Sequence, residues 1–229
     1  MIPLRDSAPS GSVPYVTIAI ILANSVIWLY EVSLGNYVDH FVADFALIPE
    51  HFVGFSHFRG GFVHNALLPL FSSLFLHAGW LHIIFNMWFL WIFGDNVEDR
   101  LGHFRYGIFY LLCGAGSGFI QVMSSPASDI PILGASGAIS GVLGAYLVSF
   151  PRARIYTLVI IIILIQFINI PAWIFLIFWF AIQLLSSASQ AGAHQDVGGV
   201  AYWAHMGGFV LGALLVWLMA KRPSVPRLS

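Results

Sequence analysis

Residues 134–150, GASGAISGVLGAYLVSF, carry no charge and consist mostly of glycine, alanine and serine. Gly137 and Gly141 have the four-residue spacing by which membrane helices approach one another closely. A helix from Ser136 to Phe150 rises about 22 Å, less than the ~30 Å hydrocarbon core of a bilayer. So short a helix persists at that depth only if its end faces protein or water instead of lipid. The stretch therefore predicts a short membrane helix that packs against neighbours.

The composition of the whole chain also indicates a membrane protein. Of its 229 residues, 59% are hydrophobic and only 8% are charged, whereas a soluble domain carries about 25% charged residues. So few charges cannot cover a water-facing surface, and we expect the lipid bilayer to surround the chain. No basic patch suggests a nucleic-acid partner, and the single Cys113 excludes an internal disulfide and a cysteine-ligated zinc site. We expect no metal and no cofactor.

Six apolar runs predict an all-α membrane protein with six transmembrane helices. Some runs are shorter than the roughly 17–25 residues of a span, so their ends must extend into flanking residues. The segment from Val32 to Gly79 forms a long first extracellular loop, apolar enough to lie against the outer leaflet or to fold as a cap. The six runs are Val13–Tyr30, Trp80–Gly94, Phe104–Met123, Ser136–Phe150, Ala172–Leu185 and Trp203–Ala220.

The apolar run Ile155–Ile170 is ambiguous between a seventh span and a segment folded at the membrane interface. Six spans with the N-terminus inside place eight of the nine basic residues inside and only Arg59 outside. A seventh span would put Lys221 and Arg222 outside, against the positive-inside bias. We therefore expect six spans, with Ile155–Ile170 at the interface.

The domain organisation follows from these spans. Residues 1–12 form a short cytoplasmic segment, residues 13–220 the membrane domain, and residues 221–229 a short basic cytoplasmic tail. We expect a multi-pass protein of the cell membrane, inner or plasma, with both termini in the cytoplasm.

Four polar side chains fall at a similar depth on three of the predicted helices. His82 and Asn86 are four residues apart and share one face near the start of the second helix. Ser136 begins the fourth helix, and His205 lies near the start of the sixth. All three helices run inward, so these side chains lie about one to two turns below the outer surface. Because polar groups in lipid are costly, this layer predicts a functional site.

The residue types in this layer indicate acyl-transfer chemistry. A serine hydroxyl becomes a strong nucleophile when a base such as neutral histidine removes its proton. No Asp or Glu lies at this depth on a predicted helix, since the acids from Asp95 to Asp99 lie on the inner side. A dyad of Ser136 as nucleophile and His205 as base remains.

Donors for a developing oxyanion are also present. The Asn86 amide, the His82 ring and the Ser136 backbone N–H at a helix start are candidates for an oxyanion hole. Gly134 and Gly137 flank the serine and would let a substrate backbone come close.

Each of these features also has a structural interpretation. Gly137 with Gly141, and Gly208 with Gly212, are helix-packing patterns. His205 taken alone could be a buried structural residue with its hydrogen bonds made, and His82 with Asn86 could serve to hydrogen-bond neighbouring helices. Packing and catalysis do not compete here, because small residues on the fourth and sixth helices would bring the serine and the histidine together.

Three motifs in this order make the chain resemble the rhomboid family over about Phe71 to Leu218. They are His82-Ile-Ile-Phe-Asn86, Gly134-Ala135-Ser136-Gly137 and Ala204-His205-Met206-Gly207-Gly208, followed by Gly212. The resemblance implies a six-helix intramembrane serine endopeptidase that cleaves transmembrane segments of membrane proteins. Ser136 is then the nucleophile, His205 the general base, and His82 and Asn86 the oxyanion donors. His77, Glu98, Gly208 and Gly212 match structural positions, with Glu98 stabilising the inner face.

Two departures from the family pattern matter. Many members carry an aromatic residue four positions after the nucleophile, stacked on the catalytic histidine, where this chain has Ser140. Something else must therefore orient His205. The Trp-Arg pair of many first loops is also absent, and Phe58-Arg59 is only loosely similar to it.

Two other functions compete with the protease. A non-catalytic rhomboid-like protein would bind membrane clients, but such relatives lose the serine or the histidine, and both are present here. The second is a small-solute transporter lined by His77, His82 and His205. Transporters are often built from two repeated halves, and this sequence has no internal repeat.

Overall fold

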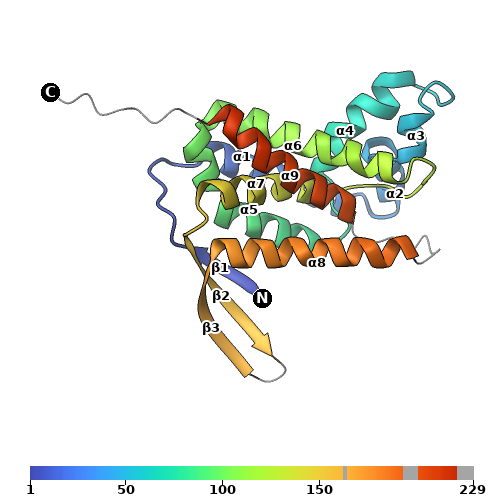
Figure 1. The fold of residues 1–229 in the computed structure, drawn as a ribbon. Helices are drawn as coiled ribbons and strands as arrows, with labels where there is room; N and C mark the ends of the chain where they lie inside the picture. The colour runs from blue at the N-terminus through green and yellow to red at the C-terminus, as the bar shows by residue number, and fades with distance from the viewer. Residues whose placement is uncertain (162–163, 193–200, 221–229) are drawn as a thin grey trace.

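The computed structural model describes residues 1–161, 164–192 and 201–220, and within them the chain is mostly helical (Figure 1). Six helices of 14 residues or more lie on the six predicted runs. They are α1 (Tyr15–Ser33), α5 (Trp80–Leu101), α6 (His103–Ser124), α7 (Ser136–Ser149), α8 (Ala172–Gly192) and α9 (Tyr202–Met219).

Length and hydropathy support a membrane location for this bundle. Three of the described helices, α1, α6 and α9, are long and apolar enough to cross a bilayer on their own. A fourth span results if the bent pair Val63–Phe75 and Trp80–Leu101 is counted as one. The apolar helix α7 (Ser136–Ser149) and the apolar part of α8, Ala172–Leu185, are shorter. A helical membrane protein is therefore supported, and the number of six spans stays a prediction.

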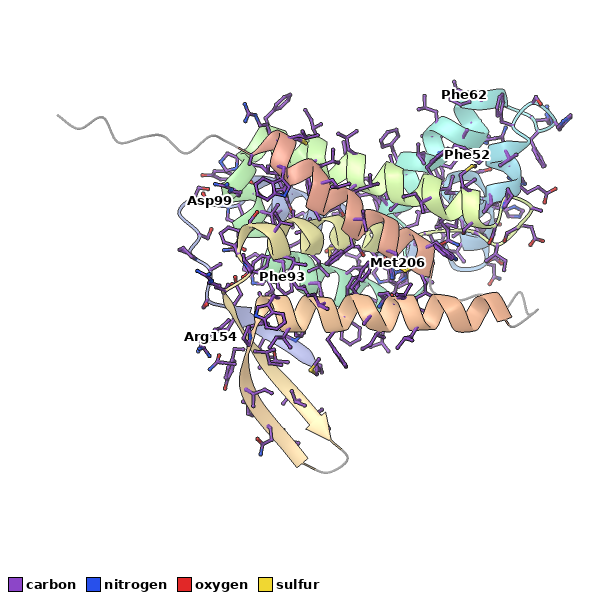
Figure 2. All side chains as sticks on the ribbon, viewed as in Figure 1. Phe52, Phe62, Phe93, Asp99, Arg154 and Met206 are labelled. Atoms are coloured by element: carbon purple, nitrogen blue, oxygen red, sulfur yellow. The ribbon has the colours of Figure 1, made fainter. Side chains whose placement is uncertain are left out.

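The long first loop is folded into short helices. It comprises η1 (Gly35–Tyr37), α2 (Val38–Phe45), α3 (Pro49–Val53), η2 (Val63–Leu67), α4 (Leu68–Ser72) and η3 (Ser73–Phe75). We call these short helices the first-loop lobe. Leu47 in this lobe is fully buried and forms an isolated β-bridge with Ile132, which ties the lobe to the segment before α7. Figure 2 shows Phe52 and Phe62 in this lobe, at the end of the bundle opposite to Asp99 and Arg154. Whether this end faces the outside stays a prediction.

The chain is mostly helical, as predicted, but the all-α prediction omitted a three-stranded antiparallel sheet. The strands are β1 (Ile2–Asp6), β2 (Arg154–Ile161) and β3 (Leu164–Pro171), in the order β1-β2-β3. Ile155–Ile170 thus forms a hairpin and not a seventh transmembrane helix, in keeping with its many β-branched residues. Figure 1 shows the hairpin projecting from the bundle beside α8. Its place at the membrane interface stays a prediction.

Hydrogen bonds fasten the N-terminal segment to the end of the bundle that carries Asp99. The Tyr146 hydroxyl donates to the Asp6 carboxylate, the Asn96 side-chain amide donates to the Ala8 carbonyl at 3.1 Å, and the Ser12 hydroxyl donates to Asp99 at 2.6 Å. Burial raises the pKa of the Asp6 carboxyl above its ordinary value, although its hydrogen bonds act in the opposite direction.

The end of α9 reaches the same end of the bundle. The Arg105 guanidinium, near the start of α6, donates to the Met219 carbonyl at 3.3 Å. Residues near the N-terminus and the last turn of α9 therefore lie at one end, as an even number of crossings requires.

Close contact between α7 and α9 forms the centre of the bundle. Every residue of α7 from Gly137 to Tyr146 is buried. A Cβ atom added to Gly208 would overlap the Gly137 carbonyl, and one added to Gly212 would overlap the Gly141 carbonyl. Only glycine permits this approach of two backbones.

Gly212→Ala should therefore destabilise the protein, because the new methyl group meets backbone that cannot rotate away. We expect a loss of about 1–3 kcal/mol in the free energy of unfolding, as for other overpacked cores. Unfolding in mild detergent measures it. Gly107→Ala is the matched control, since its Cβ meets only Val16 Cγ1 at an ordinary 3.7 Å. Equal stability of the two variants would contradict this account of the α7–α9 contact.

Cysteine labelling should report the predicted membrane topology. Cys113 is fully buried, so a membrane-impermeant maleimide should react mainly with introduced cysteines. Ser10→Cys and Ser224→Cys should label from the cytoplasmic side, and Ser125→Cys from the opposite side, because six spans separate them in that way. Ser224 belongs to the predicted tail 221–229, which lies outside the described residues. Labelling of Ser10→Cys and Ser224→Cys from opposite sides would exclude six spans.

Candidate functional site

Ser136 and His205 are in hydrogen-bond contact. The Oγ of Ser136 lies 2.7 Å from Nε2 of His205, which is only 8% exposed. Ser136 is the first residue of α7, and His205 lies in the first turn of α9. The contact therefore joins the N-terminal ends of the two helices that pack through glycines.

The backbone before Ser136 holds the serine at the start of α7. Gly134 has a φ of +121°, which side-chain-bearing residues rarely adopt, and its N–H donates to the Ser73 carbonyl at 2.8 Å. The chain then enters the helix, where the first N–H groups have no intrahelical acceptor. The Ser136 N–H is consequently available to a negatively charged oxygen close to Oγ.

The two donors expected on α5 lie next to this turn. A Cβ atom on Gly134 would be 2.7 Å from the Nε2 of His82 and 3.7 Å from the Nδ2 of Asn86. Gly134 therefore makes room for both side chains. Behind them, Nε2 of the buried His77 lies 3.1 Å from Asn86 Nδ2, and its ring centroid is 5.0 Å from that of His82. The Asn86 amide therefore has His77 as a hydrogen-bond partner.

Ser136, His205 and Asn86 line a common cavity of about 280 Å³, whereas His82 and Gly134 are not among its lining residues. Its polar atoms come from the dyad and from a few neighbouring side chains, and most of its wall is aromatic or aliphatic. The lining residues are Phe85, Asn86, Phe89, Ser136, Ile139, Ser140, Leu143, Trp179, Ile182, Gln183, Tyr202 and His205.

The remaining predicted residues lie outside this cavity. Gly137 packs against Ser117 of α6, and Gly208 and Gly212 pack against α7. A role of Gly137 beside an incoming substrate stays a prediction. Glu98 is fully buried at the opposite end of α5, where it accepts hydrogen bonds from Thr17.

The sequence interpretation missed Gln183 of α8. Its Oε1 lies 2.9 Å from Nδ1 of His205, on the far side of the ring from Ser136. Gln183 is the only amide in the apolar run Ala172–Leu185. A lone amide in a predicted membrane helix is a signal that could have indicated it.

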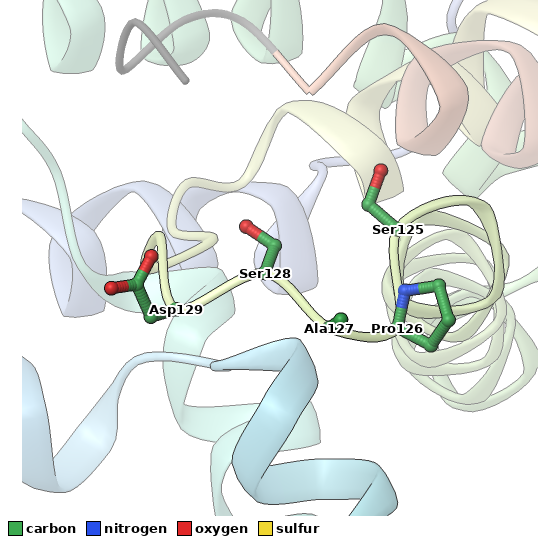
Figure 3. Close-up of a pocket in the computed structure, with 5 residues that line it drawn as sticks. All are labelled: Ser125, Pro126, Ala127, Ser128 and Asp129. Carbon is green, nitrogen blue, oxygen red and sulfur yellow. The ribbon is translucent and has the colours of Figure 1, made fainter. Parts of the chain in front are cut away.

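A second hollow, of about 290 Å³, lies on the loop between α6 and α7 (Figure 3). Its lining residues, Ser125 to Asp129, all come from one turn. The Ser128 carbonyl accepts a hydrogen bond from the Glu50 N–H at 3.0 Å, so the turn holds the first-loop lobe. The Ser128 hydroxyl accepts a hydrogen bond from the Ile130 N–H at 3.2 Å, and we assign the hollow no chemistry. Within the described residues there is also no group of three or more His, Cys, Asp or Glu that could hold a metal ion.

Comparisons with known proteins identify relatives of this chain. The family model described as the Rhomboid domain matches residues 64–222. Rhomboid-like protein 11, chloroplastic, of Arabidopsis thaliana is 28% identical over 213 residues, 88% of this chain and 68% of that protein. Rhomboid protein 1, mitochondrial, of Saccharomyces cerevisiae is 28% identical over 158 residues, 67% of this chain and 42% of that protein.

RHOMBOID-like protein 1 of Arabidopsis thaliana is 33% identical over 155 residues, 67% of this chain and 35% of that protein. The chain therefore spans from about a third to two thirds of the length of these three relatives. The first of these relatives is named as chloroplastic and the second as mitochondrial.

Asn86→Ala should slow the reaction of Ser136 with a fluorophosphonate, because phosphonylation develops negative charge on an oxygen that this amide can stabilise. Loss of a main oxyanion donor costs on the order of 10²–10³ in rate, and with His82 and the Ser136 N–H sharing the charge we expect about 10-fold. The rate of covalent labelling measures it, with Ser136→Ala as the unlabelled control. An unchanged rate would remove Asn86 from the site's chemistry.

Proposed function

This chain belongs to the rhomboid family, and we propose that it is an intramembrane serine endopeptidase that cleaves transmembrane segments of other membrane proteins. The observation that carries the proposal is the 2.7 Å contact between Ser136 Oγ and His205 Nε2 in a cavity of a membrane-type bundle. The expected nucleophile and base come from different helices, 69 residues apart in the chain.

The geometry supports a two-step acyl transfer. Ser136 Oγ attacks the carbonyl carbon of the scissile bond while His205 Nε2 takes its proton. The resulting oxyanion is stabilised by the Asn86 amide, the His82 ring N–H and the Ser136 backbone N–H. His205 then gives the proton to the leaving amine as the C–N bond breaks. Water then attacks the acyl carbon while His205 takes its proton, and His205 returns that proton to Ser136 Oγ as the ester bond breaks and the second product leaves.

The surroundings of the dyad favour an apolar substrate. Phe85, Phe89 and Trp179 line the cavity, and many side chains on the outside of the bundle are exposed apolar residues suited to lipid. A transmembrane segment offers matching surface, and its peptide bond becomes accessible once it unwinds. Transmembrane proteins and the bilayer are therefore the proposed partners, and we propose neither a metal nor a nucleic acid.

We further propose a multi-pass location in an inner or plasma membrane with both termini cytoplasmic. The distribution of basic residues supports this orientation. The alternative of a client-binding protein without catalysis has less support, because such a protein has no need of a base held against a serine.

Ser136→Ala and His205→Ala should each abolish cleavage of a model transmembrane substrate by the purified protein. The double variant should be no worse than either single variant, because the two residues act as one unit. Ser149→Ala, at the other end of α7, is the matched control and should cleave normally. Metal chelators should have no effect. Substantial cleavage by either single variant would refute the dyad.

A further inference from the structure

Three side chains from three helices form a continuous chain of contacts through His205. Ser136 of α7 lies 2.7 Å from Nε2, and the Oε1 of Gln183 of α8 lies 2.9 Å from Nδ1. Both ring nitrogens therefore have a partner, one on each side of the imidazole. Gln183 is partly buried and lines the same cavity as the dyad.

The amide oxygen can select the tautomer that general-base catalysis needs. A carbonyl oxygen only accepts hydrogen bonds, so the Nδ1 that faces Oε1 carries the proton and donates. In the neutral ring Nε2 then holds a lone pair directed at the Ser136 hydroxyl. The opposite tautomer would place a proton on Nε2 and leave the serine without a base.

The other neighbours of His205 do not perform this task. Ser140, at the position where many rhomboid family members carry an aromatic residue, donates to the Ser136 carbonyl at 2.7 Å. The rings of Trp179 and Tyr202 have centroids 6.2 and 6.4 Å from that of His205, so they pack beside it. Packing restricts the ring plane but does not distinguish the two nitrogens.

We infer that Gln183 is a positioning residue of the dyad, whose side-chain oxygen holds His205 in the orientation and tautomer that accept the Ser136 proton. The inference rests on the proposed function and deepens it. A carboxylate would accept the same proton but would bring a charge into the mostly apolar cavity lined by Trp179 and Ile182, whereas the amide accepts it without a charge. The chain thus uses a neutral group where soluble serine hydrolases use an acid.

Gln183→Met tests the inference, since methionine keeps the length and flexibility of the side chain but removes the strong acceptor. We expect kcat for a transmembrane substrate to fall about 10- to 100-fold, in the range attributed to general-base catalysis, with KM changed less than twofold. The rate of fluorophosphonate labelling of Ser136 should fall in parallel, because that small reagent does not depend on substrate binding.

Three further variants separate positioning from packing. Gln183→Glu keeps an oxygen acceptor and should retain at least a third of the kcat of the original protein, as a rescue of Gln183→Met. Gln183→Asn shortens the reach by one methylene and should lose activity as Gln183→Met does, which serves if the methionine variant is unstable in thermal unfolding. Leu185→Met makes the same kind of change at a position that is 71% exposed, and should leave kcat unchanged.

The outcomes are distinct from those that test the proteolytic function. If the unmodified protein neither cleaves nor reacts with the fluorophosphonate, the proposed function fails. If it does both and Gln183→Met retains its kcat and labelling rate, only the role of Gln183 is overturned. Equal losses in the Met and Glu variants would also overturn it, because they would indicate a packing role without need of an acceptor.

Discussion

The backbone contact between α7 and α9 is the constraint on which the rest of the structure depends. In lipid, apolar side chains gain little by leaving their surroundings, so helices associate through close packing and hydrogen bonds. Gly208 against the Gly137 carbonyl and Gly212 against the Gly141 carbonyl provide that closeness. Serine and histidine have short side chains, and they reach 2.7 Å only because their helices are this near. The glycine pattern and the dyad are therefore one feature.

Contacts hold helix α5 near both of its ends, which matters because it carries the proposed oxyanion donors. At its C-terminal end the buried Glu98 accepts hydrogen bonds from the Val16 and Thr17 N–H groups in the first turn of α1, at 2.9 and 2.8 Å. A carboxylate at a helix N-terminus satisfies free N–H groups and interacts favourably with the helix dipole, which offsets its burial. At the other end, His77 contacts Asn86. His77 thus holds the Asn86 amide, and Glu98 links α5 to α1 by capping the N-terminus of α1.

The long helices, and the layer that brings Ser136 and His205 together, could be predicted from the sequence because a membrane restricts the possible structures. Backbone in lipid must be helical or in a closed barrel, and polar residues there are rare enough to be conspicuous. The sequence did not predict the sheet, since Ile2–Asp6 pairs with a strand about 150 residues away and a continuous apolar run fits helix and strand alike. The sequence also did not predict that α5 continues to Leu101, because the acidic Asp95 and Asp99 interrupt the apolar run. In the structure both carboxylates contact the N-terminal segment, at Ser10 and Ser12. The role inferred for Gln183 depends on its contact with His205 of another helix, which the apolar run around Gln183 does not reveal.

The sheet connects elements that the helical pattern would leave separate. Its N-terminal strand is held to α5 where the Trp88 indole N–H donates to the Pro3 carbonyl at 2.6 Å, and β3 leads directly into α8. The outer edge of β3 has backbone groups without a neighbouring strand, and such an edge is not stable in hydrocarbon. Its exposed Ile165 and Phe167 side chains, however, avoid water. A membrane interface satisfies both requirements, since water reaches the edge while lipid covers the side chains. If the hairpin lies at the interface as predicted, it holds the start of α8 at a fixed depth, since β3 leads directly into α8.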